Sequence, residues 1–131
     1  MIVVDSSALI AVLEQEPEAE KFLVAIRDAP RRLVSAVSVN ETGIVIGVRR
    51  GREGAAEMMS FLDELGVEIV PFAEPYISQA LDAYSRFGKG IDPKARLNLG
   101  DCAAYALAKV LKVPLLFKGS DFTHTDIQQY A

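Results

Sequence analysis

The chain has 131 residues, 50% of them hydrophobic, and a net charge of −4 from 14 basic and 18 acidic residues. This length is close to the commonest domain size, so we expect one domain over residues 1–131 with a core of its own. The single cysteine, Cys102, excludes an internal disulfide, and no apolar run approaches the roughly 18 residues of a membrane span. The N-terminus has no basic region and reaches an acid at Asp5, so we expect no secretory signal and a cytoplasmic protein.

The first half of the chain alternates short apolar runs with helical patterns. Residues 2–5 form a β-branched run that ends in Asp5 and predicts a buried strand. Ser38 and Glu41 have the spacing of a capping box, which predicts a helix beginning there and ending at Gly51. The other predicted elements are helices over 8–13, 18–28 and 55–65 and strands over 33–36 and 67–70.

The second half repeats the alternation. A helical pattern over 75–87 is followed by a polar loop over 88–98, and Asn98 is suited to cap a helix that runs to Leu111. Residues 113–117 predict a fourth main strand, 119–121 a turn, and 127–130 a short edge strand. Strands that alternate with helices and are uniformly apolar are typical of parallel sheets covered on both faces. We therefore predict an α/β fold, a three-layer α/β/α sandwich with a central, mainly parallel sheet of four to five short strands.

Four acids fall where this topology converges. Asp5 and Asp121 follow strands, and Glu41 and Asp101 lie in first turns of helices. In a parallel sheet, strand ends and helix starts share one edge, and ligands bind there. Each acid also has a structural explanation: Glu41 and Asp101 as capping or dipole residues, and Asp121 as a turn residue. Asp5 is the hardest to explain this way, because an acid that ends an apolar strand is costly unless it is paired.

Clustered carboxylates need a neutralising charge. Two of them about 5 Å apart repel by roughly 3 kcal/mol at an effective dielectric of about 20. Oxygen ligands without a nearby histidine suit Mg²⁺ or Mn²⁺ rather than zinc. Acids with no nucleophile–base pair favour metal-assisted hydrolysis of a phosphodiester. The net negative charge argues only weakly against a nucleic-acid substrate, since the four acids would be neutralised by the metal.

Four stretches, in order, carry a resemblance to a known family. They are Ile2–Leu9 (IVVDSSAL), Ser35–Glu41 (SAVSVNE), Asn98–Ala108 (NLGDCAAYALA) and Leu116–Phe122 (LFKGSDF). Together they span nearly the whole chain. The sequence resembles the PIN-domain nucleases and, within them, the VapC-type toxins of toxin–antitoxin pairs.

The resemblance implies a PIN-like fold, endoribonuclease activity and an acidic metal site made of Asp5, Glu41, Asp101 and Asp121. It implies that Ser7 orients a ligand or water, with a plain helix-start hydroxyl as the alternative, and it makes Asp126 a candidate outer acid, with a surface acid as the alternative. It also implies RNA as substrate, Mg²⁺ or Mn²⁺ as cofactor, a homodimer, and a VapB-like antitoxin as partner.

The loop before Asp101 supplies the candidate substrate contacts. Lys89, Lys94 and Arg96 could bind phosphates, or could simply be solvated loop residues. Asp92, in the same loop, stands where the resemblance leads us to expect a basic or neutral residue, a departure that leaves the acidic site intact and concerns substrate preference. Two other functions stay open: an aspartate-nucleophile phosphatase using Asp5, which would usually have a second aspartate where Ser7 stands, and a catalytically silent binding module.

Overall fold

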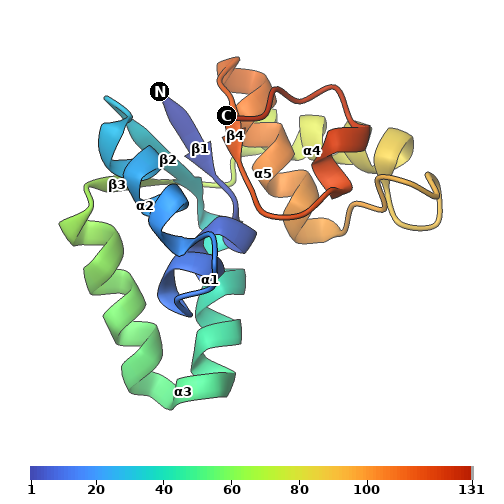
Figure 1. The fold of residues 1–131 in the computed structure, drawn as a ribbon. Helices are drawn as coiled ribbons and strands as arrows, with labels where there is room; N and C mark the ends of the chain where they lie inside the picture. The colour runs from blue at the N-terminus through green and yellow to red at the C-terminus, as the bar shows by residue number, and fades with distance from the viewer. Residues whose placement is uncertain (131) are drawn as a thin grey trace.

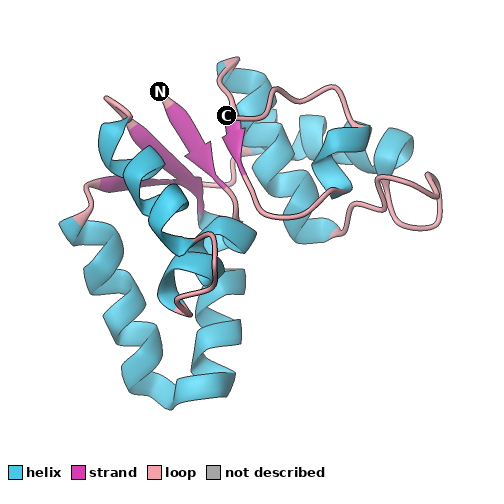
Figure 2. Ribbon diagram, viewed as in Figure 1, coloured by secondary structure: helices cyan, strands magenta, loops and turns pink. Residues whose placement is uncertain are grey.

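The fold is built on a four-stranded sheet in which all strands run parallel (Figures 1 and 2). A computed structural model describes residues 1–130. The strand order is β3–β2–β1–β4, with bounds β1 Ile2–Val4, β2 Arg32–Ser35, β3 Val67–Val70 and β4 Leu115–Leu116. At the β4 edge, the predicted strand over 127–130 is reduced to one parallel bridge between Leu115 and Gln129.

Helices cover both faces of the sheet. The bounds are α1 Ser6–Leu13, α2 Ala19–Asp28, α3 Ala36–Glu64, α4 Glu74–Phe87 and α5 Leu99–Leu111. Side chains of a strand alternate between faces: Ile2 and Val4 join the core under α1, α2 and α3, whereas Val3 joins the core under α4 and α5. The α/β/α sandwich with a parallel sheet is thus confirmed, and Figure 1 shows α4 and α5 on the opposite side of the sheet from α2.

Helix α3 consists of two arms joined at Gly51. This glycine has φ 77° and ψ −170°, a left-handed conformation that breaks the helical path. The chain then turns back toward the sheet, so the two arms stand side by side (Figure 1). The predicted helix end at Gly51 and the separate helix over 55–65 describe these two arms.

The start of α3 differs from the prediction. The cap is Ser35, whose Oγ accepts a hydrogen bond from the Val37 amide, and the helix begins at Ala36. Ser38 lies inside the helix, where its Oγ is buried without a partner. Because strand β2 runs directly into α3, no linker residues precede the cap and the helix starts three residues early. Glu41 therefore has no capping function and projects from the second turn.

Strand ends and helix starts meet at one edge of the sheet. The β1 end is tied to the β4 end by a hydrogen bond from the Asp5 amide to the Leu116 carbonyl. Strand β2 ends at the cap of α3. We call this the carboxyl edge. Over residues 1–130, no helix has the length and apolarity needed to cross a membrane.

Candidate active site

Asp5 is the buried centre of the carboxyl edge. It caps α1 in an extended conformation, and its Oδ2 accepts hydrogen bonds from the Ser7 amide (3.0 Å) and the Ser7 hydroxyl (2.6 Å). Asp5 as a whole is only 2% exposed. Its other carboxylate oxygen, Oδ1, is buried and has no hydrogen-bond partner. Burial raises the pKa of Asp5 to about 7, and the charges of Asp101 and Glu41 act in the same direction against the hydrogen bonds from Ser7.

Ser7 links two strands through its hydroxyl. The Oγ donates to Asp5 and accepts from the Lys118 amide at 3.0 Å, just beyond β4. The hydroxyl proton and one lone pair are therefore used within the protein. In this arrangement Ser7 orients the carboxylate of Asp5 and ties it to the segment that leads to Asp121.

Glu41 reaches the same edge from α3. The Ser6 hydroxyl donates a 2.7 Å hydrogen bond to Glu41 Oε1. The carboxylate also lies against the first turn of α5, because a Cβ built on Gly100 would come within 2.5 Å of Oε1 and 2.7 Å of Oε2. Glu41 thus bridges the turn after β1 and the start of α5.

Asp101 serves as a helix cap and as a neighbour of the other acids. Asn98 Oδ1 accepts from the Asp101 amide, and Asp101 Oδ2 accepts from the Asn98 amide, which is the predicted capping box. Burial raises the pKa of Asp101 to about 6; the hydrogen bond from Asn98 opposes this, and the charges of Glu41 and Asp121 add to it. Asp101 therefore both caps α5 and belongs to the acidic group.

Asp121 opens a 3₁₀ turn, Asp121–His124, after β4. Its neighbour Phe122 is buried, with its ring centroid 5.0 Å from that of Phe117, so the turn is held on the core. Asp121 and Asp101 line one surface hollow of about 340 Å³, together with Lys89, Arg96 and Asn98. This hollow is the open side of the acidic group.

The four predicted acids are thus electrostatic neighbours: Asp5 with Glu41 and Asp101, and Asp101 with Glu41 and Asp121. Within residues 1–130, no three histidine, cysteine, aspartate or glutamate side chains stand in an arrangement that could hold a metal ion as they are. Glu41 and Asp101 direct oxygens to Ser6 and Asn98. The buried Asp5 Oδ1, which lacks a partner beside two other acids, nevertheless fits a hard cation.

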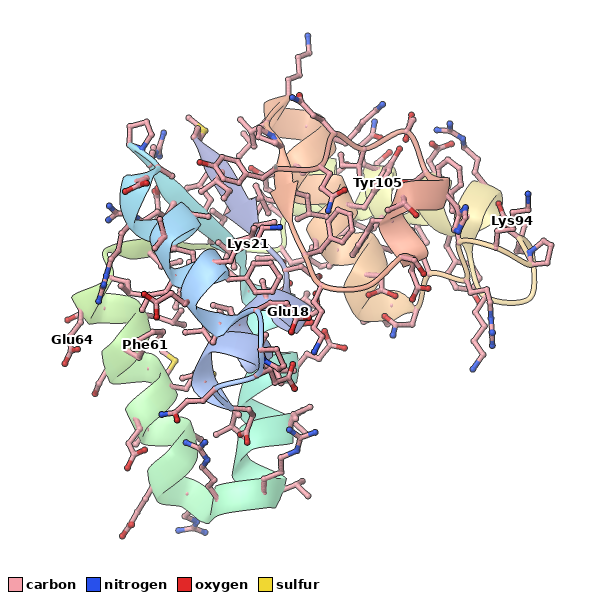
Figure 3. All side chains as sticks on the ribbon, viewed as in Figure 1. Glu18, Lys21, Phe61, Glu64, Lys94 and Tyr105 are labelled. Atoms are coloured by element: carbon pink, nitrogen blue, oxygen red, sulfur yellow. The ribbon has the colours of Figure 1, made fainter. Side chains whose placement is uncertain are left out.

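The three basic residues of the loop over 88–98 differ in how close they lie to the acidic group. Lys89 and Arg96 line the hollow with Asp101 and Asp121, whereas Lys94 does not. Figure 3 shows Lys94 on the outer tip of this loop, at the edge of the molecule. Asp92 Oδ1 accepts hydrogen bonds from the Lys94 and Ala95 amides, which lowers the pKa of this carboxyl. Asp92 therefore stabilises the backbone of its own loop.

Asp126 belongs to a different cluster. It accepts hydrogen bonds from the Tyr105 hydroxyl and from Lys109 Nζ (2.8 Å), and Arg86 lies 3.5 Å away. Burial alone would raise the pKa of Asp126, but the hydrogen bonds and charges of these partners lower it to about 2. Tyr105, labelled in Figure 3, is fully buried. The cluster fastens the C-terminal segment to α5.

This placement gives a prediction. Asp126→Asn should lower the free energy of unfolding by about 1–2 kcal/mol, because it weakens a hydrogen bond to a buried hydroxyl. It should leave catalysis within about twofold, since none of the four acids contacts Asp126. Urea denaturation and an RNA-cleavage assay at 25 °C measure the two effects. A loss of activity without a loss of stability would place Asp126 in the catalytic group after all.

Two residues of the site were not predicted. Ser6 holds Glu41, and Gly100 makes room for it. The signal for Gly100 was present, since glycine is a poor helix former and stands in the first turn of an otherwise alanine-rich helix. For Ser6 there was none, because two adjacent serines offer no way to tell which one faces which acid.

The sequence matches the PIN domain family over residues 2–128. The chain belongs to the PIN-domain family. Among curated relatives, ribonuclease VapC30 of Mycobacterium tuberculosis is 44% identical over 130 residues, covering 99% of this chain and 98% of that protein. Ribonuclease VapC of Mycolicibacterium smegmatis is 45% identical over 126 residues, covering 96% and 97%. These relatives place the chain with the VapC ribonucleases of the family and confirm the resemblance inferred from its motifs.

Solved structures confirm the PIN fold. VapC20 of Mycobacterium tuberculosis, described as a sarcin-ricin loop cleaving toxin, superposes with a TM-score of 0.81 at 15% identity, over 99% of this chain and 98% of that one. A toxin–antitoxin complex from Klebsiella pneumoniae gives a TM-score of 0.74 at 16% identity, over 96% and 93%. The predicted PIN-like architecture is therefore correct.

Proposed function

We propose that this PIN domain, acting as one unit over residues 1–131, is a VapC-type endoribonuclease toxin that hydrolyses RNA phosphodiester bonds with Mg²⁺ or Mn²⁺. The observation that carries the proposal is Asp5 Oδ1, a buried carboxylate oxygen with no partner beside two further acids. Such an oxygen is costly in the folded state unless a cation contacts it. The curated relatives, which bear the name ribonuclease, support the reaction class.

In this proposal Asp5, Glu41, Asp101 and Asp121 hold the ion. A bound divalent cation polarises a phosphoryl oxygen and makes water a better nucleophile. The chain's own residues keep the carboxylates in place: Ser7 fixes one oxygen of Asp5 and leaves the other free, and Ser6 holds Glu41. Water would add to phosphorus and lose one proton to solvent, the bond to the leaving oxygen would break, and that oxygen would take up one proton from solvent.

The hollow beside Asp101 and Asp121 would bind the RNA backbone. Lys89 and Arg96 line it and can contact phosphates next to the acids. The structure gives Lys94 no place in this hollow, so it stays a weaker candidate for substrate binding.

Arg96→Ala should weaken RNA binding several-fold and reduce the salt dependence by about one phosphate contact. Lys94→Ala is the matched control, in the same loop but outside the hollow, and should change affinity less than twofold. Fluorescence anisotropy with a labelled RNA at several salt concentrations, in Ca²⁺ or with a cleavage-deficient variant, measures both. Equal effects of the two substitutions would contradict this assignment.

A VapB-like antitoxin is the proposed protein partner, and the cytoplasm the proposed location. The support for the antitoxin comes from the fold neighbours, which include toxin–antitoxin complexes and a VapBC2 complex from Rickettsia felis bound to a promoter DNA fragment.

We also propose a homodimer through an exposed apolar strip on α3, α4 and α5. Leu81 on α4 and Leu99 on α5 are 68% and 77% exposed, and both line one apolar hollow. Leu99 also lines the neighbouring hollow with Ile44 of α3. A continuous exposed apolar surface of this kind marks an interface. Leu81→Glu should produce a monomer in light scattering, while Val24→Glu on α2 should leave the dimer intact; a dimeric Leu81→Glu protein would exclude this surface.

The function is tested with purified protein and structured cellular RNA. Cleavage should require Mg²⁺ or Mn²⁺, stop in EDTA, and fall at least about 100-fold in Asp5→Asn, because even residues that only support a metal ligand contribute 10–100-fold. Undiminished cleavage by Asp5→Asn would overturn the proposal. A phosphorylated Asp5 trapped with a phosphate donor would favour the phosphatase, and RNA binding without cleavage would favour the silent module.

A further inference from the structure

Gly100 lies where the start of α5 meets the carboxylate of Glu41. It is the second residue of the helix, is buried, and directly precedes Asp101. A Cβ at this position would lie 2.5 Å from Glu41 Oε1, 2.7 Å from Oε2 and 2.8 Å from the carboxyl carbon. These three atoms are the nearest ones that it would meet. The carboxylate of Glu41 therefore occupies the volume that any other residue would fill with its side chain.

The carboxylate of Glu41 is also held by Ser6. This serine is buried at the start of α1, directly after Asp5, and its hydroxyl donates to Glu41 Oε1 at 2.7 Å. Glu41 thus contacts two elements that each carry another acid of the group, with Asp5 beside Ser6 and Asp101 beside Gly100. Neither contact is needed to form α1 or α5, whose caps are Asp5 and Asn98.

We propose that Gly100 is a positioning residue of the active site: the absence of its side chain creates the seat in which Ser6 holds the Glu41 carboxylate next to Asp5 and Asp101. The inference rests on the proposed metal-dependent function. It assigns a role to two residues that are neither metal ligands nor substrate contacts, and it explains why a glycine stands in the first turn of a helix that otherwise favours alanine.

The physical consequence of Gly100→Ala is a displaced carboxylate in an intact fold. The atoms in conflict are the far end of a flexible side chain, so Glu41 can rotate away while the backbone stays in place. Alanine is a better helix former than glycine, so the helix itself gains. We therefore expect Gly100→Ala to melt at the same temperature as the wild type or higher, while its Mn²⁺ affinity and cleavage rate each fall at least about tenfold, the lower bound for loss of a supporting contact.

A merely structural glycine would not be coupled to Glu41, and a double-mutant cycle measures that coupling. Glu41→Asp shortens the side chain by one methylene group and should lower Mn²⁺ affinity and the cleavage rate at least about tenfold in the wild-type background. In Gly100→Ala the carboxylate is already displaced, so adding Glu41→Asp should lower Mn²⁺ affinity and the cleavage rate only about threefold or less. Gly47→Ala is the control, because a Cβ there meets no atom within 4 Å, and it should leave Mn²⁺ affinity and cleavage unchanged.

The experiment measures Mn²⁺ binding by calorimetry, RNA cleavage and thermal melting for all variants. Wild-type Mn²⁺ affinity and cleavage in Gly100→Ala, or additive losses in the cycle, would overturn the inference. If Gly100→Ala melted well below the wild type, Ser6→Ala would be the deciding variant. It removes the hydrogen bond to Glu41 without adding atoms. Wild-type Mn²⁺ affinity in Ser6→Ala would also overturn the inference. Equal cleavage by wild type and Asp5→Asn is a separate outcome, which would reject the proposed function itself.

Discussion

Asp5→Asn is expected to stabilise the metal-free protein while it abolishes activity. Holding Asp5 ionised in the folded state is unfavourable, since its pKa rises from 3.8 to about 7. At about 1.4 kcal/mol per pKa unit, the cost at pH 8 is on the order of 4 kcal/mol. An asparagine keeps an oxygen for the hydrogen bonds from Ser7 and carries no charge. For a chain of this size the gain corresponds to a melting temperature higher by roughly 15 °C.

The measurement is thermal melting at pH 8 in EDTA and again with Mn²⁺. Asp63→Asn, an exposed aspartate near the end of α3, is the matched control and should leave the melting temperature within about 1 °C. Mn²⁺ should stabilise the wild type and have no effect on Asp5→Asn. A lower melting temperature for metal-free Asp5→Asn would show that the charge of Asp5 is compensated within the protein.

The stability of the metal-free protein should fall as pH rises from about 4 to 7. Asp5 and Asp101 have folded-state pKa values of about 7 and 6, both raised from 3.8. Between 3.8 and these values the folded state binds more protons than the unfolded state, so each rise in pH favours unfolding. We expect the free energy of unfolding in EDTA to be roughly 3 kcal/mol higher at pH 5 than at pH 8, with Asp5 contributing more than the partly exposed Asp101.

Asp126 has the opposite dependence. Its pKa is lowered to about 2, so its contribution is present above pH 3.8 and is lost as pH falls toward 2. Urea denaturation from pH 3 to 8 should therefore show a maximum near pH 4 in EDTA. Asp5→Asn should flatten the fall above pH 5. Stability that instead rises steadily from pH 5 to 8 in EDTA would contradict the raised pKa values.

Much of the fold could be predicted because its signals are local. The β-branched run before Asp5, the glycine at Gly51 and the cap at Asn98 act over a few residues. The start of α3 could not be predicted in this way. Ser35 and Ser38 are both good caps in the sequence, and the choice between them depends on where β2 stops pairing with β3, a long-range contact.

In the candidate site, too, the features set by local sequence and topology could be predicted, and those set by distant side chains could not. Topology alone predicts that the backbones of Asp5, Glu41, Asp101 and Asp121 reach one edge, and the structure shows charge interactions linking all four. The directions of the carboxylates depend on side chains far away in sequence, such as Ser6 for Glu41. Likewise, three basic residues of one loop are equivalent in sequence, yet only Lys89 and Arg96 face the hollow because the loop closes on Asp92.

The central claim is that a divalent ion compensates the buried charge of Asp5, to which the neighbouring acids add. Calorimetric titration of Mn²⁺ into the metal-free protein at pH 6.5, in buffers of different ionisation enthalpy, tests it directly, because metal binding must release the protons that the raised pKa values retain. The account predicts binding with release of about one proton in the wild type and neither binding nor proton release in Asp5→Asn. Binding of equal affinity in both proteins, without proton release, would contradict it.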